Sequence, residues 1–182
     1  SLDPHGRQGN EFLQLFLDHT GPGAHHLTFR FPDIHEAVAS AQREGWQVLY
    51  VRADDPGWHE AFFHPREGLG TVLQLTAYPG QQKGIPFDSS SDSSAVSVEV
   101  INLAVADRAR ALRLFRHVLG GVVLDDDLLR WPNRAAIRLL DAPPSGVRSI
   151  EISAADVGGS EPIDIRPFGQ TPVVSSSISG AR

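Results

Sequence analysis

The chain contains no cysteine, which excludes a disulfide framework and any chemistry that needs a thiolate. Basic residues are few: 16 Lys and Arg against 22 Asp and Glu give a formal net charge of −6. Nucleic-acid binding needs a basic patch, so we expect no nucleic-acid partner. No apolar run approaches the roughly 18 residues that span a bilayer, and no signal peptide is visible. We therefore expect a cytoplasmic protein with no membrane partner.

The remaining composition is that of a globular protein. The chain has 182 residues with 41% hydrophobic and 21% charged content, enough for one large domain or two small ones. It has no methionine and begins with Ser1, so we expect that the sequence starts after a translation start. Pattern and composition divide it into a leading segment with a short helix at 1–23, a first module at 24–78, a linker at 79–95, a second module at 96–154 and an irregular tail at 155–182.

The first module follows one plan, strand, helix and three strands. The strand near 24–31 alternates, with His26, Thr28 and Arg30 on one face. Asp33 is placed to cap a helix near 34–44, and Gly45 is placed to end it. Strands are predicted at 46–51, 60–64 and 71–77. The last of these carries one polar residue, Gln74, between two leucines.

After the Ser- and Pro-rich linker the plan recurs. Asp107 lies 74 residues after Asp33 and is placed to cap a helix near 108–118. Strands are predicted at 98–105, 135–140 and 147–153, with another near 128–131. Ile163–Ile165 and Val173-Val174 are candidate edge strands in the tail. By alternation, Ile150-Glu151-Ile152 matches the strand of Gln74, so we expect Gln74 and Glu151 at equivalent positions.

Taken in order, these segments resemble the vicinal oxygen chelate superfamily, which includes glyoxalases, extradiol dioxygenases and bleomycin-resistance proteins. The resemblance covers about residues 10–154, and the first module is most similar to the C-terminal module of a methylmalonyl-CoA epimerase. The segments that carry it in the first module are Gly21-Pro-Gly-Ala-His-His-Leu-Thr-Phe29, Pro32-Asp-Ile34, Glu60-Ala-Phe-Phe-His-Pro65 and Leu73-Gln-Leu-Thr-Ala-Tyr-Pro79.

This resemblance implies an α+β fold in which tandem βαβββ modules form a cupped mixed β-sheet, with flanking helices, over a divalent metal (Zn, Mn, Fe, Co or Ni). By position it gives His26, Gln74 and Glu151 as metal ligands, with Glu151 also the catalytic carboxylate. The family usually has Glu where Gln74 stands. The fourth ligand would be a His at Val100, which cannot bind a metal; Asn102 is the nearest polar residue on that strand face.

Three functions remain open at this point. The first is a metal-dependent isomerase, lyase or dioxygenase that acts on a small oxygen-bearing substrate through a metal-stabilised enolate or oxyanion. The second is a metal-free small-molecule binding protein like those that confer bleomycin resistance, with Trp46, Trp58 and Trp131 as stacking surfaces. The third is a degenerate paralogue with an interaction role. In all three a homodimer is possible, and His64 is expected to shape a turn.

Overall fold

The computed structural model describes residues 18, 24, 26–79, 96–132, 134–154 and 173–176. The linker, most of the leading segment and most of the tail lie outside these residues, so the predicted module boundaries stay predictions. Within the described part, no helix is long and apolar enough to cross a bilayer.

The first unit has the predicted βαβββ connection. Its four strands form one sheet in the order β1-β4-β3-β2, in which β1 and β4 are parallel. Asp33 caps the helix as predicted, accepting a hydrogen bond from the His35 backbone N–H at 2.8 Å. The elements are β1 (His26–Phe31), α2 (Ile34–Arg43), β2 (Val48–Arg52), β3 (His59–Phe63) and β4 (Val72–Ala77).

The second unit repeats this connection and then adds two strands. Its sheet has the order β10-β9-β5-β8-β7-β6, so β5-β8-β7-β6 has the same order as the first sheet. Asp107 caps its helix through the Arg110 backbone N–H at 2.9 Å. The elements are β5 (Val96–Ala104), α3 (Arg108–Arg113), the π-helical turn η2 (Leu114–Val118), β6 (Val122–Val123), β7 (Leu128–Arg130), β8 (Ala136–Leu140), β9 (Gly146–Ala154) and β10 (Val173–Ser176). β10 confirms the edge strand expected at Val173-Val174.

The strand equivalent to β4 is β8, not β9 as the sequence match proposed. β5 pairs with β8 in parallel, as β1 pairs with β4, whereas β9 is antiparallel and lies on the other edge of β5. The residues Ile150-Glu151-Ile152 alternate like those around Gln74 because both strands have one face against the core. Alternation reports which face is buried and carries no information on which strand lies alongside.

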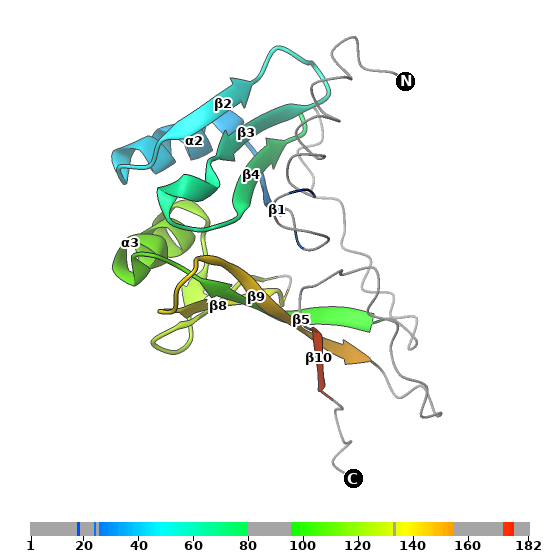
Figure 1. Ribbon diagram of the computed structural model, residues 1–182. Coiled ribbons are helices and arrows are strands. Elements are labelled where there is room, and N and C mark those ends of the chain that lie inside the picture. Colours follow the sequence, from blue (N-terminus) through cyan, green and yellow to red (C-terminus); the bar gives the residue numbers. More distant parts are fainter. Residues whose placement is uncertain are drawn as a thin grey trace.

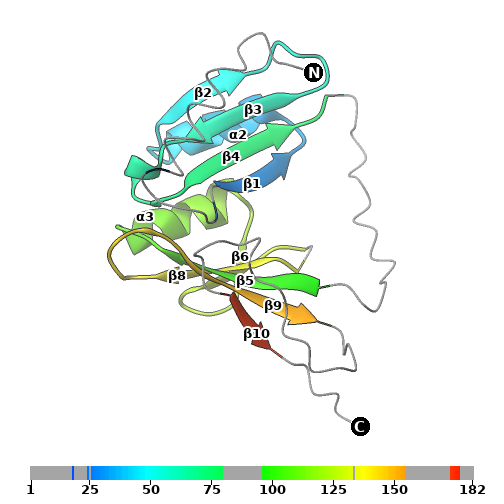
Figure 2. The same ribbon diagram turned by 45° about the vertical axis from the view of Figure 1, so that its right-hand side comes forward.

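The strands form two sheets, which confirms the α+β class but not a single continuous sheet. Figures 1 and 2 show the four-stranded sheet above the six-stranded sheet, with α3 between them. Phe29 of β1 lies 6.0 Å from Phe115 of η2 and 5.3 Å from Trp131 (ring centroids), so the two units share one core. The face of each sheet that holds polar residues is the face turned away from this core.

Two loops lock the units together by backbone contact. A Cβ on Gly70, in the turn before β4, would lie 2.0 Å from the carbonyl carbon and oxygen of Ser145. Gly70 also has φ +64°, a left-handed conformation that suits glycine. Close by, the Ala106 backbone N–H donates to the Gly68 carbonyl at 2.8 Å. The turn before β4 is thus fitted against the β8–β9 turn with no room for a side chain.

Arg110 of α3 adds the main polar link between the units. Its guanidinium lies 2.7 Å from the Glu67 carboxylate, donates to the Glu67 carbonyl at 2.9 Å and to the Gly45 carbonyl at 3.0 Å. It also lies 4.0 Å from the centre of the Trp46 ring. One half-buried side chain therefore ties α3 to the ends of two elements of the first unit.

Candidate functional site

The polar face of the four-stranded sheet carries a hydrogen-bonded chain across three strands. The Thr28 hydroxyl on β1 donates to Gln74 Oε1 on β4 at 2.9 Å. The Gln74 amide in turn donates to Glu60 Oε2 on β3 at 3.1 Å. Phe62 and Tyr50 continue the Thr28–Gln74 row across the sheet. Gln74 itself is only 9% exposed, and its buried amide has a hydrogen-bond partner on each neighbouring strand.

Glu60 is a site residue that the sequence reasoning did not single out. It lies two residues from Phe62 on β3, which places it on the same face as Gln74 once the strand pairing is known. In the sequence, Glu60 is only an acidic residue at the start of a predicted strand, with no pattern that links it to Gln74.

His26 lies on this same face of β1, exposed and paired in register with Val72. Gln74 is on the neighbouring strand, two residues after Val72 and opposite Thr28. His64 accepts a hydrogen bond from the Arg66 backbone N–H at 2.9 Å and caps the short 3-10 turn at Pro65–Glu67, which confirms the turn role predicted for it. His25 lies outside the described residues.

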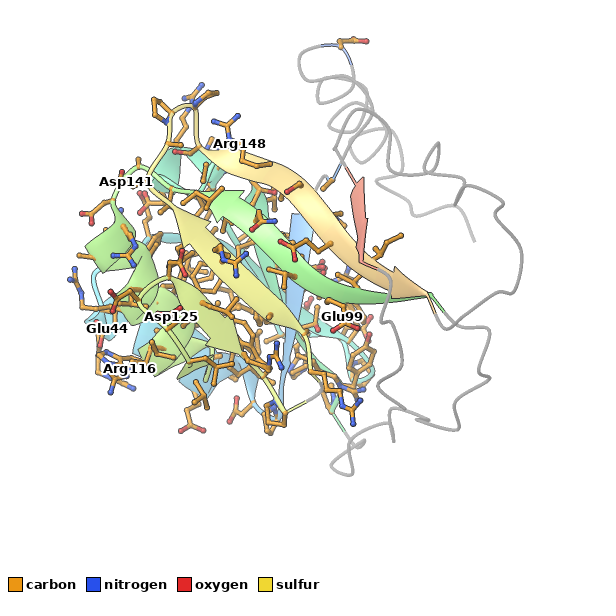
Figure 3. The ribbon with its side chains drawn as sticks, turned by 90° about the horizontal axis from the view of Figure 1, so that it is seen from below. Glu44, Glu99, Arg116, Asp125, Asp141 and Arg148 are labelled. Carbon is orange, nitrogen blue, oxygen red and sulfur yellow. The ribbon has the colours of Figure 1, made fainter. Side chains whose placement is uncertain are left out.

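The polar face of the six-stranded sheet is built around Glu151. The Asn102 amide donates to Glu151 Oε1 and to Ser149 Oγ, both at 2.9 Å. Arg138 Nη1 lies 3.4 Å from Glu151 Oε1, and its Nε lies 3.8 Å from an Asp127 oxygen. Figure 3 views this sheet from below, with Glu99 toward one end of the strands and Asp141 and Arg148 toward the other. Glu151 is thus already engaged by a buried amide and a guanidinium.

The strand registers give a residue-by-residue match between the two faces. Thr28 pairs with Gln74, and Asn102 pairs with Arg138, so Arg138 occupies in the second unit the position of Gln74 in the first. His26 corresponds to Val100 by the same register. Arg138 also stands between two aliphatic residues in its strand, the signal that drew attention to Gln74, so the sequence contained the information needed to find it.

These donors do not fit a divalent metal held by His26, Gln74 and Glu151. Gln74 lies on one sheet and Glu151 on the other, and each is on the face of its sheet that is turned away from the shared core. The amide oxygen of Gln74 already accepts the Thr28 hydroxyl, and a guanidinium lies where the second unit would need a ligand. Within the described ranges, no three His, Cys, Asp or Glu side chains are grouped to hold a metal ion.

Of the three tryptophans, two pack against the core and one lies at the end of the four-stranded sheet. Trp46 is 3% exposed and packs edge-on against Phe63 in the shared core. Trp131 packs on Phe29, and its indole N–H donates to the Leu119 carbonyl at 2.6 Å. Trp58 is half-buried beside Tyr78, just past the last paired residues of β3 and β4. Trp46 and Trp131 are therefore structural, and Trp58 is the stacking candidate.

No protein-family model matches this chain, and no curated protein matches it. Among solved structures, a hypothetical protein from Staphylococcus aureus is similar with a TM-score of 0.55 and 15% identity, over 97% of this chain and 74% of that one. This likeness concerns the fold alone.

Two further solved structures are similar over part of their length. The V278E mutant of glyoxalase I from Zea mays has a TM-score of 0.43 and 16% identity, over 81% of this chain and 55% of its own. The 2,2',3-trihydroxybiphenyl 1,2-dioxygenase from Sphingomonas wittichii has a TM-score of 0.46 and 15% identity, over 72% and 53%. This chain spans about half the length of each.

Proposed function

We propose that this protein is a glyoxalase-like protein of the vicinal oxygen chelate type that binds a small organic molecule on a polar sheet face, without a divalent metal held by His26, Gln74 and Glu151. The observation that carries the proposal is Arg138. Its guanidinium occupies the register position matched to Gln74 and lies 3.4 Å from Glu151. A fixed positive charge beside the one carboxylate of the predicted ligand set opposes the binding of a second cation.

The strand order supports the same proposal. Two βαβββ units with the order 1-4-3-2 place polar groups on rigid strands, the setting in which a few convergent polar groups can orient a small ligand. Exposed side chains on the polar face of the four-stranded sheet include His26, Thr28 and Tyr50. A possible homodimer and the absence of nucleic-acid and membrane partners remain predictions.

The test is the metal content of protein purified without chelator, measured by elemental mass spectrometry on the wild type and on His26→Ala. The proposal expects well under one equivalent of Zn, Mn, Fe, Co or Ni per chain, with the same value in the variant. It also expects that a small-molecule ligand found by thermal-shift screening still binds after treatment with EDTA.

Near one equivalent of metal, lost in His26→Ala, would overturn the proposal. That result would support the metal-dependent isomerase, lyase or dioxygenase instead. It would also require a ligand set other than the one the resemblance implies, because Gln74 and Glu151 lie on different sheets.

A further inference from the structure

Four aromatic side chains form two pairs, one on the polar face of the four-stranded sheet and one at the end of its strands β3 and β4. Tyr50 of β2 and Phe62 of β3 are cross-strand neighbours with ring centroids 6.0 Å apart. Trp58 and Tyr78 form the second pair, edge to face at 87° and 4.9 Å apart. Tyr50 is 51% exposed, and the other three are half-buried. Both pairs lie near the hydrogen-bonding groups of this face, and their rings are partly exposed.

A carboxylate lies between these two pairs. Glu60 and Phe62 are two residues apart on β3 and share one face, and Trp58 lies just before the strand, two residues from Glu60. Glu60 is half-buried and accepts a hydrogen bond from Gln74. The ion pairs found among the described residues do not include it. Since a carboxylate has about four acceptor positions, Glu60 keeps the capacity to accept a further donor.

The two arginines of this face contact groups other than Glu60. Arg52 lies 3.7 Å from both Asp54 and Asp55 in the turn after β2. The guanidinium of Arg30 lies 4.2 Å from the centre of the Tyr78 ring, which shows that this ring accepts a cation. Arg52 is paired with both aspartates of this turn, so Glu60 is the carboxylate of the face that remains to pair with a cation. This carboxylate favours a cationic group over an anionic one beside it.

We infer that this face binds a small organic cation that carries an aromatic ring, with its ammonium group at Glu60 and its ring against an adjacent aromatic pair. The inference rests on the proposed function, because it names the ligand class of the metal-free site. A carboxylate supplies charge and hydrogen bonds to the ammonium, and aromatic faces attract both the cation and the ring. A ligand with a carboxylate in place of the ammonium would meet Glu60 with like charge.

The test is a titration of the full chain with three ligands of similar shape and different charge: 2-phenylethylammonium, 2-phenylethanol and 3-phenylpropionate. The readout is the NMR signal of the Trp58 indole N–H, assigned by its loss in Trp58→Phe. The ammonium should shift this signal and bind at least about tenfold more tightly than the alcohol, with the carboxylate weakest.

The variant Glu60→Gln keeps the size of the side chain and removes its charge. It should weaken binding of the ammonium by about tenfold and leave binding of the alcohol unchanged. Glu36→Gln is the matched control, because Glu36 is exposed on α2, against the opposite face of the same sheet. Unchanged Trp46 and Trp131 indole signals would verify that both variants fold.

Equal binding of the three ligands to the wild type, or no binding of the ammonium, would overturn the inference. So would an ammonium affinity that Glu60→Gln and Glu36→Gln change equally. None of these results depends on metal content, so the inference can fail while the metal-free proposal stands. Stoichiometric metal lost in His26→Ala would instead refute the proposed function itself.

Discussion

On the four-stranded sheet Thr28 and Gln74 form a neutral cross-strand pair, whereas the six-stranded sheet has Asn102 and Arg138 at the same register. In the first unit the chain of hydrogen bonds ends on Glu60, which shares a face of β3 with Phe62 and follows Trp58 by two residues. In the second unit the carboxylate Glu151 is held by a buried amide and a guanidinium. The strand order fixes where a side chain projects, and the residue placed there decides what the face can bind.

The same comparison separates a face suited to a ligand from a face occupied by its own side chains. Glu60 has one hydrogen bond from a neutral amide, and Glu151 has a hydrogen bond and an ion pair. We therefore assign ligand binding to the first unit and a structural role to the polar cluster of the second.

The largest expected effect comes from Gly70→Ala, which tests whether the two units fold as one body. A Cβ would collide with the Ser145 backbone at 2.0 Å, and the left-handed φ adds strain, so we expect a loss of about 3 kcal/mol or more in the free energy of unfolding. Urea denaturation measures it. Gly45→Ala is the control: φ is +78° but nothing lies within 4 Å, so the loss should be about 1 kcal/mol. Equal losses would mean that the loop contact between the units does not constrain the fold.

Arg110→Ala tests the polar link between the units. It removes an ion pair, two hydrogen bonds to carbonyls and the stacking on Trp46, so we expect a loss of about 2 kcal/mol in urea denaturation. Arg113→Ala is the matched control, because Arg113 is 51% exposed and 3.9 Å from Glu44, and it should lose less than about 0.5 kcal/mol. A loss in Arg110→Ala no larger than in this control would contradict the role of Arg110.

Asn102→Ala and Thr28→Val compare the two polar rows directly. Asn102 is 8% exposed and donates to two partners, so its removal should cost about 1–2 kcal/mol. Thr28 is exposed and donates once, so its removal should cost less than about 0.5 kcal/mol. The measurement is again the free energy of unfolding in urea. A larger loss in Thr28→Val than in Asn102→Ala would show that the row of the second unit does not contribute more to stability than the row of the first.

A smaller effect than that of Asn102→Ala should follow Arg138→Gln, which gives the second unit the residue of the first. Arg138 is 35% exposed and its ion pairs are 3.4 and 3.8 Å long, so the expected loss of stability is below about 1 kcal/mol. Arg130→Gln, on the exposed part of β7, is the control. If Arg138→Gln cost more than Asn102→Ala, the guanidinium and not the amide would be the main support of Glu151.

Much of the fold could be predicted from local signals, because helix caps and strand alternation depend on residues that are close together in the sequence. Asp33 and Asp107 mark both helix starts, and the strands of the first unit fall within a few residues of their predicted places. β6 was not predicted, since a two-residue strand has no periodicity and exists only through its pairing with β7.

The candidate site was harder to predict because it depends on which strands are neighbours. Gln74 and His26 do share one face, as alternation indicates. Glu60 joins Gln74 only through the β3–β4 register. Glu151 was matched to the wrong strand because Gln74 and Glu151 each stand between two aliphatic residues, a pattern that does not identify the neighbouring strand. That the two polar faces lie on opposite sides of a common core follows from packing between units, which no residue-by-residue pattern records.

The parallel pairing of the first and last strand of each unit also sets the order of events during folding. Thr28 and Gln74, which meet across β1 and β4, are 46 residues apart in the chain. The β2–β3 and β3–β4 hairpins close over much shorter stretches, so they can form while β1 is still unpaired. During synthesis, β1 must therefore wait until β4 has left the ribosome, and the Thr28–Gln74–Glu60 chain is among the last parts of the first unit to assemble.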